Sequence, residues 1–256
     1  MKLALTHAIP PKINDCQLTH LERQPIDLKL AEEQHAAYCD TLRSRGLKVI
    51  ELDVNTDYPD GLFVEDIAVV LDELAIMANP GAETRRGEVP GIEMELAKYR
   101  DISRIEAPAT LDGGDVLVVG KRVFVGLSIR TNRMGAGALQ RILKPLGYQV
   151  HTVRVKGVLH LKSAITAIDE ATLLCNPHFI DSAPFANFRL VTVAANEPWA
   201  ANALPVGGIV LLADGFPFTA EKVTRLGYRV QLVDIREIQK AEGGLTCSSI
   251  IFRADN

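Results

Sequence analysis

The sequence has few of the features that mark membrane, disulfide-rich or nucleic-acid-binding proteins. Its four cysteines lack CxxC spacing, so we expect reduced thiols rather than a disulfide framework. Its most apolar stretch, residues 204–213, has about half the length needed to cross a bilayer, and the apolar run at the N-terminus is too short for a signal peptide. No lysine-arginine run stands out, and the formal net charge is −4. These absences predict a soluble, cytoplasmic protein without a membrane or nucleic-acid partner.

What the sequence does contain is a repeat. Two short apolar runs separated by a tight polar or glycine turn predict a β-hairpin, and this pattern recurs at residues 63–71/74–78, 115–119/123–126, 163–168/171–175 and 203–206/209–212. Helix-like stretches follow at residues 86–99, 133–146 and 219–226, whereas residues 176–187 are too irregular to assign. A further strand is expected in each module, at residues 102–105, 148–155, 188–193 and 228–233, and another at 47–52 precedes the first hairpin.

The two ends of the chain supply a fifth hairpin, formed by residues 248–252 and 2–6. The repeat therefore predicts a closed ring of five α/β modules, with no free sheet edge between first and last, in a single domain spanning residues 1–256. An ordinary two-layer α/β domain is the alternative, but it does not explain the persistent spacing or the strand at the C-terminus. Residues 6–29 are polar and contain three prolines, so we expect a long surface loop that covers a site.

Chemically active residues stand just before the first strand of successive hairpins: Glu65-Asp66, Asp112, His160, Asn202 and Cys247. In a closed ring these strand entrances converge near one axis, which would place carboxylates, an imidazole and a thiol in one pocket. Each residue alone also fits a structural role, as a solvated turn, an Asx turn, a packed histidine or an inert buried thiol. Charges within the apolar run 63–70, however, are costly unless they are paired or line a site.

This set of groups suits a substrate with a delocalised positive charge. Carboxylates beside a thiol raise its pKa and hinder attack on a neutral substrate, whereas a guanidinium is planar, stays protonated and pairs with carboxylates. A bound guanidinium would also lower the pKa of the thiol, and the histidine would give a proton to the leaving amine and take one from water. The pocket therefore predicts attack of the thiol on a guanidinium carbon and hydrolysis of the resulting thiouronium.

With these residues identified, the chain resembles the dimethylarginine dimethylaminohydrolases of the guanidine-modifying (pentein) superfamily. The resemblance runs almost from end to end and depends on seven motifs, at residues 63–66, 80–88, 105–108, 113–116, 130–132, 159–162 and 245–247. It implies a five-bladed α/β propeller, closed by pairing of the N- and C-terminal strands. It also implies hydrolysis of Nω-methylated arginine to citrulline and a methylamine.

The resemblance assigns roles at the reacting end of the substrate to five residues. Cys247 matches the nucleophile and His160 the general acid and base. Asp112 matches an acidic position that orients the histidine and contacts the guanidinium. Asp66 would clamp the guanidinium, with Glu65 beside it.

Five further residues match positions that bind the amino-acid end of the substrate. Arg85 and Arg130 correspond to the two arginines that hold the carboxylate. Asp60 and the backbone carbonyl of Leu18 correspond to contacts with the α-amino group. A backbone contact that precedes the nucleophile falls at Ala241.

The resemblance implies a small-molecule substrate, no cofactor and, since the family includes dimers, a homodimer as one assembly. Some members bind zinc as an inhibitor at the active-site thiol, but the sequence shows no dedicated metal site. One alternative is an arginine deiminase-like or other small-guanidine hydrolase of the same superfamily, although the chain lacks room for the extra helical segments of the larger members. A non-enzymatic alternative is an inactive protein that binds arginine derivatives.

Overall fold

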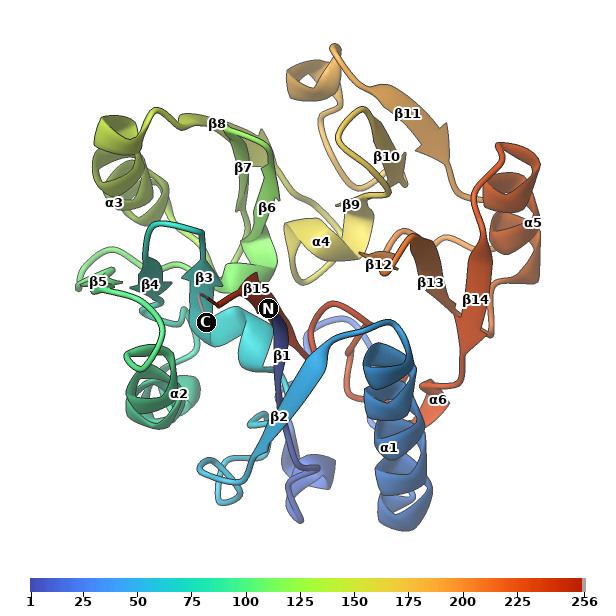
Figure 1. Ribbon diagram of the computed structural model, residues 1–256, viewed down its shortest axis with the longest axis horizontal. Coiled ribbons are helices and arrows are strands. Elements are labelled where there is room, and N and C mark those ends of the chain that lie inside the picture. Colours follow the sequence, from blue (N-terminus) through green and yellow to red (C-terminus); the bar gives the residue numbers. More distant parts are fainter. Residues whose placement is uncertain (255–256) are drawn as a thin grey trace.

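The computed structural model describes residues 1–254, in which five three-stranded sheets form a ring (Figure 1). In each sheet the first two strands pair antiparallel and the third runs parallel to the middle one. In ring order the sheets are β15(Ile250–Arg253)–β1(Lys2–His7)–β2(Lys48–Leu52), β3(Ala68–Val70)–β4(Ala75–Met77)–β5(Ile102–Arg104), β6(Val116–Val119)–β7(Arg122–Leu127)–β8(Gln149–Arg154), β9(Ile165–Ala167)–β10(Thr172–Cys175)–β11(Arg189–Thr192) and β12(Leu204–Val206)–β13(Ile209–Ala213)–β14(Val230–Val233). This is the predicted five-bladed α/β propeller.

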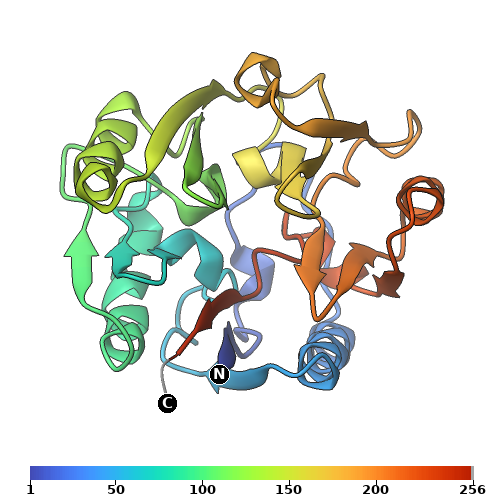
Figure 2. The ribbon, with the colours of Figure 1, turned by 45° about the horizontal axis from the view of Figure 1, so that its top comes forward.

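The first and last strands close the ring. Strand β15 pairs antiparallel with β1, with Leu3 opposite Phe252 and Leu5 opposite Ile250, and Figure 2 shows these two strands, dark red and dark blue, side by side. A cavity of about 240 Å³ is lined by residues from the first strand of every sheet, including Val69, Leu117, Thr166, Pro205 and Ile251. The five inner strands therefore surround a common axis, as the repeat predicts.

Helices connect the second and third strands of the blades and lie on the outside of the ring (Figures 1 and 2). They are α1(Leu28–Ser44), α2(Val89–Leu96), α3(Arg133–Leu143) and α5(Pro217–Arg225), and the fourth blade has only a short 3₁₀ turn, η6(Ala183–Phe185), in this position. Helix α3 illustrates how local sequence determines where such a helix begins and which face it buries. Asn132 caps its first turn by accepting the Gly135 amide, and Ala136, Leu139 and Leu143 form a stripe buried against the blade.

Shorter turns complete the chain at the blade entrances and in the connections. The α-helical ones are α4(Leu161–Ala164) and α6(Arg236–Gln239), and the 3₁₀ turns are η1(Ile13–Asp15), η2(Val64–Ile67), η3(Glu83–Glu88), η4(Gly113–Asp115) and η5(Lys144–Leu146). None of the helices within residues 1–254 combines the length and hydrophobicity required to traverse a bilayer.

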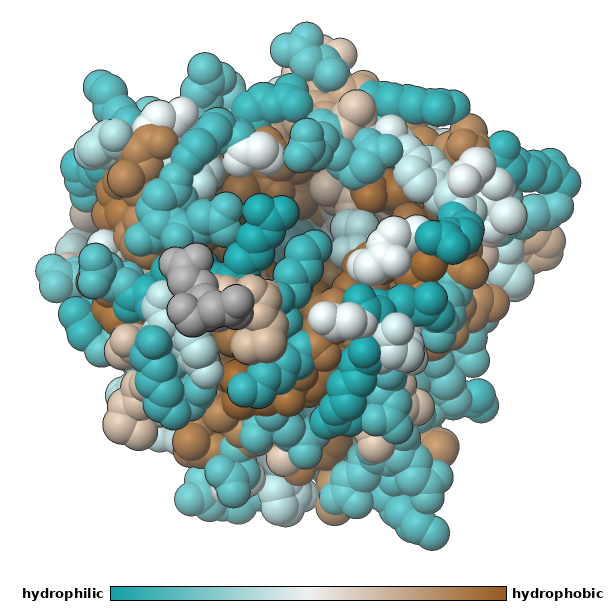
Figure 3. Space-filling view, in the orientation of Figure 1, coloured by the Kyte–Doolittle hydropathy of each residue, from teal (hydrophilic) through white to brown (hydrophobic). Residues whose placement is uncertain are grey.

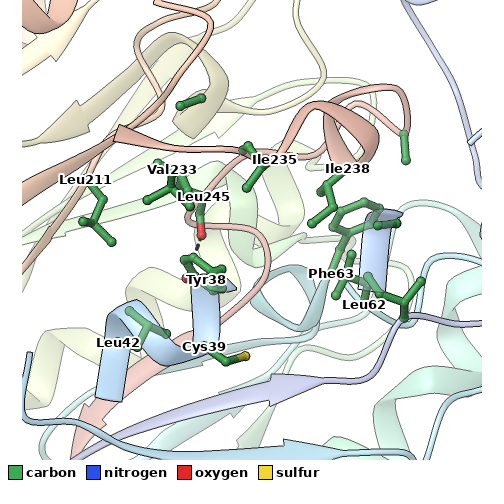
Figure 4. Close-up of a cluster of buried hydrophobic side chains, with 14 of the residues drawn as sticks. Tyr38, Cys39, Leu42, Leu62, Phe63, Leu211, Val233, Ile235, Ile238 and Leu245 are labelled. Atoms are coloured by element: carbon green, nitrogen blue, oxygen red, sulfur yellow. Dashed lines mark hydrogen bonds between the residues drawn. The ribbon is translucent and has the colours of Figure 1, made fainter. Parts of the chain in front are cut away.

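Hydrophobic clusters fill the spaces where neighbouring elements meet. In the cluster drawn in Figure 4, Tyr38 of α1 packs with Phe63, Val233 and Ile238, and its hydroxyl donates to the Leu245 carbonyl oxygen at 2.9 Å. Helix α1 therefore supports the loop that precedes β15. On the face in Figure 3, hydrophilic side chains cover most of the periphery, with hydrophobic ones between them.

At two blade entrances a helical turn replaces the start of a predicted strand. Residues 64–67 of the predicted strand 63–71 form η2, and residues 163–164 of the predicted strand 163–168 belong to α4. In both places a helical turn directs polar side chains into the ring before the strand starts. The predicted loop 6–29 is also shorter than expected, because β1 runs to His7 and α1 begins at Leu28.

Candidate active site

Seven of the ten predicted site residues line one small cavity: Asp60, Asp66, Arg85, Arg130, His160, Ala241 and Cys247. Glu65 precedes the lining residue Asp66 in the sequence, and Asp112 is hydrogen-bonded to the lining residue His160. Leu18 follows the lining residue Gln17. The cavity volume is about 20 Å³, which accommodates about one water molecule. The ring thus brings the predicted residues together in a closed state.

Cys247 lies on the turn before β15, where its side chain is half-buried. Its sulfur accepts the Gly244 amide at 3.4 Å, and the neighbouring Thr246 amide donates to Asn202 from the preceding blade. Burial, together with the carboxylates of Glu65 and Asp66, raises the pKa of Cys247 to about 12. The free site therefore holds a neutral thiol, which only a cation bound nearby would convert to a thiolate at neutral pH.

His160 is buried between two carboxylates. Its Nε2 lies 3.0 Å from Asp112 Oδ2 and its Nδ1 lies 3.6 Å from Asp66 Oδ1. Burial alone would lower the pKa of His160, but the charge of Asp66 and the hydrogen bond with Asp112 outweigh it and raise that pKa to about 9. The imidazole is therefore protonated at neutral pH and holds a proton for a leaving group.

The Gly113-Gly114 pair of η4 has a steric role at this site. A Cβ on Gly114 would lie 2.5 Å from Asp66 Oδ1 and 2.8 Å from His160 Nδ1, and a Cβ on Gly113 would collide with the Glu65 carbonyl. Glycine is required because the turn backbone passes directly against the acid and the imidazole. The Gly114 amide uses this approach to donate to Asp66 Oδ1 at 3.1 Å.

Glu65 is occupied by other partners beside the cavity. Its carboxylate lies 2.6 Å from Lys162 Nζ and accepts the Thr246 hydroxyl at 2.7 Å, while its amide donates to the Cys247 carbonyl at 3.3 Å. Both Glu65 and Lys162 line the larger cavity on the ring axis rather than the small one. Glu65 therefore contacts the turn that carries Cys247 from outside the small cavity.

The two predicted carboxylate-binding arginines differ in their partners. Arg85 is buried and donates to both oxygens of Glu88, to Asp66 at 2.5 Å, and to two backbone carbonyl oxygens, which leaves one N–H for a ligand. Arg130 is also buried, with 7% of the residue exposed, and its guanidinium makes no hydrogen bond within residues 1–254. Arg130 is therefore the cation in the cavity that is free to receive an anion.

Residues 16–27, which we call the lid, begin beside the cavity, where Gln17 is one of the lining residues. The Gln17 amide donates to both oxygens of Asp60, at 3.1 and 3.2 Å. Glu242, whose φ of 58° lies in the left-handed region, accepts three consecutive lid amides through one oxygen, from Thr19, His20 and Leu21 at 2.9, 2.5 and 2.7 Å. Carboxylates on the body of the protein thus hold the lid closed.

Sequence reasoning missed three residues that organise the site. Glu242 anchors the lid and Lys162 pairs with Glu65. Asp115 accepts the Leu161 amide at 2.9 Å and so fixes the residue after His160; burial raises the pKa of Asp115 to about 6. Their partners are distant in the chain, so no local motif indicates these roles. Asp115 is the exception, because it directly follows the Gly113-Gly114 pair, which lies in one of the motifs of the family resemblance.

Two groups of side chains within the described residues have the spacing of metal ligands. The first is Asp66, Asp112 and His160 in this site, where the carboxylates already pair with the imidazole. The second is His35, Cys39 and Glu51, between α1 and β2.

Comparisons with known proteins identify the family of the chain. A family model described as "N,N dimethylarginine dimethylhydrolase, eukaryotic" matches residues 9–189. The N(G),N(G)-dimethylarginine dimethylaminohydrolase of Streptomyces coelicolor is 39% identical over 254 residues, which cover 98% of this chain and 97% of that protein. The protein of the same name from Pseudomonas aeruginosa is 37% identical over 228 residues, covering 88% and 90%.

Solved structures give the same result. A dimethylarginine dimethylaminohydrolase from Pseudomonas aeruginosa, a cysteine-to-serine variant complexed with citrulline, matches with a TM-score of 0.93 at 35% identity, over 97% of this chain and 98% of that one. An amidinotransferase from Microseira wollei matches at only 15% identity, with a TM-score of 0.82 over 99% and 94% of the two chains. At this low identity, the match with the amidinotransferase shows a similar fold only.

Proposed function

The chain belongs to the dimethylarginine dimethylaminohydrolase family, and on that premise we propose that it hydrolyses Nω-methylated L-arginine to L-citrulline and a methylamine. The observation that carries the proposal is the single cavity shared by a thiol, a protonated imidazole and a carboxylate, those of Cys247, His160 and Asp66, with the free guanidinium of Arg130 at its wall. The substrate's two charged ends would each meet the opposite charge there.

At the guanidinium end, Asp66 and Asp112 supply the negative charge. Asp66 would share its carboxylate between Arg85 and the substrate guanidinium, while Asp112 holds the imidazole of His160 from the other side. A bound guanidinium offsets the two charges that raise the pKa of the thiol, those of Glu65 and Asp66, and so favours the thiolate. The substrate thereby activates its own nucleophile.

At the amino-acid end, Arg130 would bind the carboxylate, supported by the remaining N–H of Arg85. Asp60 would bind the α-ammonium group in place of the lid amide of Gln17 that it now accepts, and the carbonyl oxygen of Leu18 would accept a second ammonium hydrogen. The backbone at Ala241 lines the wall next to the nucleophile turn.

The chemistry then runs in two stages. On substrate binding the proton of Cys247 passes to solvent, and the thiolate sulfur forms a bond with the guanidinium carbon. His160 donates its proton to the methylated nitrogen, the C–N bond breaks and the amine leaves. In the second stage His160 removes one proton from water, and the resulting hydroxide adds to the thiouronium carbon. The C–S bond then breaks to release the thiolate, and the remaining O–H proton passes to solvent, which gives citrulline.

Substrate entry requires the lid to open. A space of about 20 Å³ cannot contain an arginine derivative. The lid's attachment through backbone amides to Asp60 and Glu242 is well suited to reversible opening, because water can satisfy both sides of these hydrogen bonds when they break.

The test is a substrate panel with full-length reduced protein: asymmetric dimethylarginine, monomethylarginine and unmethylated arginine, with citrulline measured by colour reaction. We expect the highest kcat/KM for a methylated arginine. Cys247→Ser should abolish citrulline formation and still bind substrate, whereas the control Cys175→Ser, which changes a buried thiol outside the cavity, should remain active. Preference for unmethylated arginine would support a deiminase instead, and binding without turnover by the unaltered protein would indicate an inactive binding protein.

Three further expectations are part of the proposal. Residues 1–256 would act as one catalytic domain, because the closing strands come from both ends of the chain. The four cysteines of the described residues are all free, which fits a reducing cytoplasm. A homodimer, which the family resemblance allows, can be tested by sedimentation equilibrium.

A further inference from the structure

His35, Cys39 and Glu51 form a group of potential ligands outside the active site. His35 and Cys39 are one helical turn apart on α1 and so project from the same face, and Glu51 reaches them from the neighbouring strand β2. The imidazole and the thiol are buried, with exposed fractions of 3% and 1%. The Glu51 side chain is 45% exposed, which leaves one side of the group open to solvent.

The three ligand atoms lie close together without a strong hydrogen bond among them. His35 Nε2 lies 3.6 Å from Cys39 Sγ and 3.6 Å from Glu51 Oε2, and Cys39 Sγ lies 3.8 Å from Glu51 Oε2. An N–H···O hydrogen bond has a length of about 2.7–3.2 Å. This length excludes a hydrogen bond between His35 Nε2 and Glu51 Oε2. The two contacts of the Cys39 sulfur, at 3.6 and 3.8 Å, are weak sulfur hydrogen bonds.

The same distances match ligands that share one metal ion. Tetrahedral zinc with Zn–S of about 2.3 Å and Zn–N and Zn–O of about 2.0–2.1 Å separates its ligand atoms by roughly 3.3–3.6 Å. The observed triangle differs from these separations by only a few tenths of an ångström. A sulfur, an imidazole nitrogen and a carboxylate oxygen are also a donor set that zinc accepts.

The His35 ring has no close polar partner among the described residues. Its Nδ1 is buried without a hydrogen-bond partner within residues 1–254, and its Nε2 has only the contacts of 3.6 Å just described. A buried nitrogen without a close partner is costly, and an ion at the site is one of the recognised explanations. An ion inside the triangle would satisfy Nε2, whereas Nδ1 would keep its N–H without a partner in this part of the chain.

From these observations we propose that His35, Cys39 and Glu51 bind a divalent zinc ion, with the fourth position open to water. We expected no dedicated metal site from the sequence, because i, i+4 ligands on a helix and one on a distant strand form no compact motif. On binding, the Cys39 S–H bond breaks, its proton passes to solvent and a Zn–S bond forms. The ion would clamp α1 to β2, next to Tyr38, which holds the loop that leads to Cys247.

The test uses full-length Cys247→Ser, in which the active-site thiol is absent. Titration with Co²⁺ should give a thiolate-to-cobalt charge-transfer band that saturates at one ion per chain, and Zn²⁺ should displace it. Adding Zn²⁺ should also raise Tm. Introducing Cys39→Ser into this background should abolish the band, whereas the matched control Cys175→Ser, another buried free cysteine, should leave it unchanged.

Glu51→Gln in the same background provides a variant that is expected to fold, because this side chain is largely at the surface. It should weaken Zn²⁺ binding by at least tenfold and remove the rise in Tm. Absence of a charge-transfer band in the Cys247→Ser protein would overturn the proposal. So would binding that survives both the Cys39 and the Glu51 substitutions but is lost in Asp112→Asn, because the metal would then lie in the active site.

Discussion

Replacing Asp112 with asparagine should move the pH at which the enzyme loses activity. The side chain keeps its shape and can still accept the Gly81 amide, now at 2.9 Å, but it loses the charge that faces His160 Nε2 at 3.0 Å. A hydrogen bond to a charged group contributes about 1.5–3 kcal/mol, and 1.36 kcal/mol corresponds to one pH unit. We therefore expect the pKa of His160 to fall by about 1–2 pH units.

In the unaltered protein the pKa of His160 is about 9, against an ordinary value of 6.5. General-acid catalysis by the imidazolium should therefore persist to about pH 9 and decline above it. In Asp112→Asn the alkaline limb of kcat/KM should decline 1–2 pH units earlier, but not fully to the ordinary value, because Asp66 remains. Citrulline formation measured from pH 6 to pH 10 reports this limb, and NMR titration of the histidines in a Cys247→Ser background reports the pKa directly.

The free energy of unfolding should also depend on pH through His160. Because folding raises the pKa of His160, its contribution to stability is complete below the unfolded value of about 6.5 and is lost as the pH rises through about 9. Asp112→Asn should therefore cost more free energy of unfolding at pH 6 than at pH 10. Asp101→Asn, which alters an exposed acid, is the control. An alkaline limb that coincides in the Asp112 variant and the unaltered protein would refute this account of His160.

Three further predictions concern the surroundings of the site. Glu242→Gln removes the charge that accepts three lid amides, so their hydrogen exchange should accelerate roughly 5- to 30-fold for a loss of about 1–2 kcal/mol; unchanged protection would exclude Glu242 as the anchor. Lys162→Met leaves the buried Glu65 charge unpaired and should destabilise the protein by about 3–5 kcal/mol in urea unfolding, with partial recovery in the double variant that also carries Glu65→Gln. Gly114→Ala places a Cβ 2.8 Å from His160 Nδ1 and should reduce kcat far more than it reduces Tm; full activity would contradict the observed packing.

The sequence predicted the ring because short strands and tight turns are local signals. Strands such as β7, expected at residues 123–126 and observed at Arg122–Leu127, depend on β-branched runs and neighbouring turns. The convergence of Asp66, His160 and Cys247 followed from their equivalent positions in the repeat, since each precedes the first strand of a blade. A repeat thus converts local spacing into a three-dimensional prediction.

Interactions between distant side chains could not be predicted in this way. The hydrogen bond from Thr19 to Glu242 joins residues 223 positions apart, and that from Thr246 to Glu65 joins residues 181 apart. Helix α1 was also missed, although its buried residues Ala31, His35, Tyr38 and Leu42 have helical spacing. The engagement of Arg85 with Asp66 depends on tertiary packing that no motif encodes.

The pairing of β1 with β15 bears on the order in which the molecule is completed during synthesis. The contact between Met1 and Ala254 spans 253 positions, so this blade can be completed only after β15 has been synthesised. Contacts of such separation carry the greatest loop-closure entropy and are the slowest to form. Because Cys247 lies on the turn that enters β15, the proposed site should be assembled only once β15 has paired with β1.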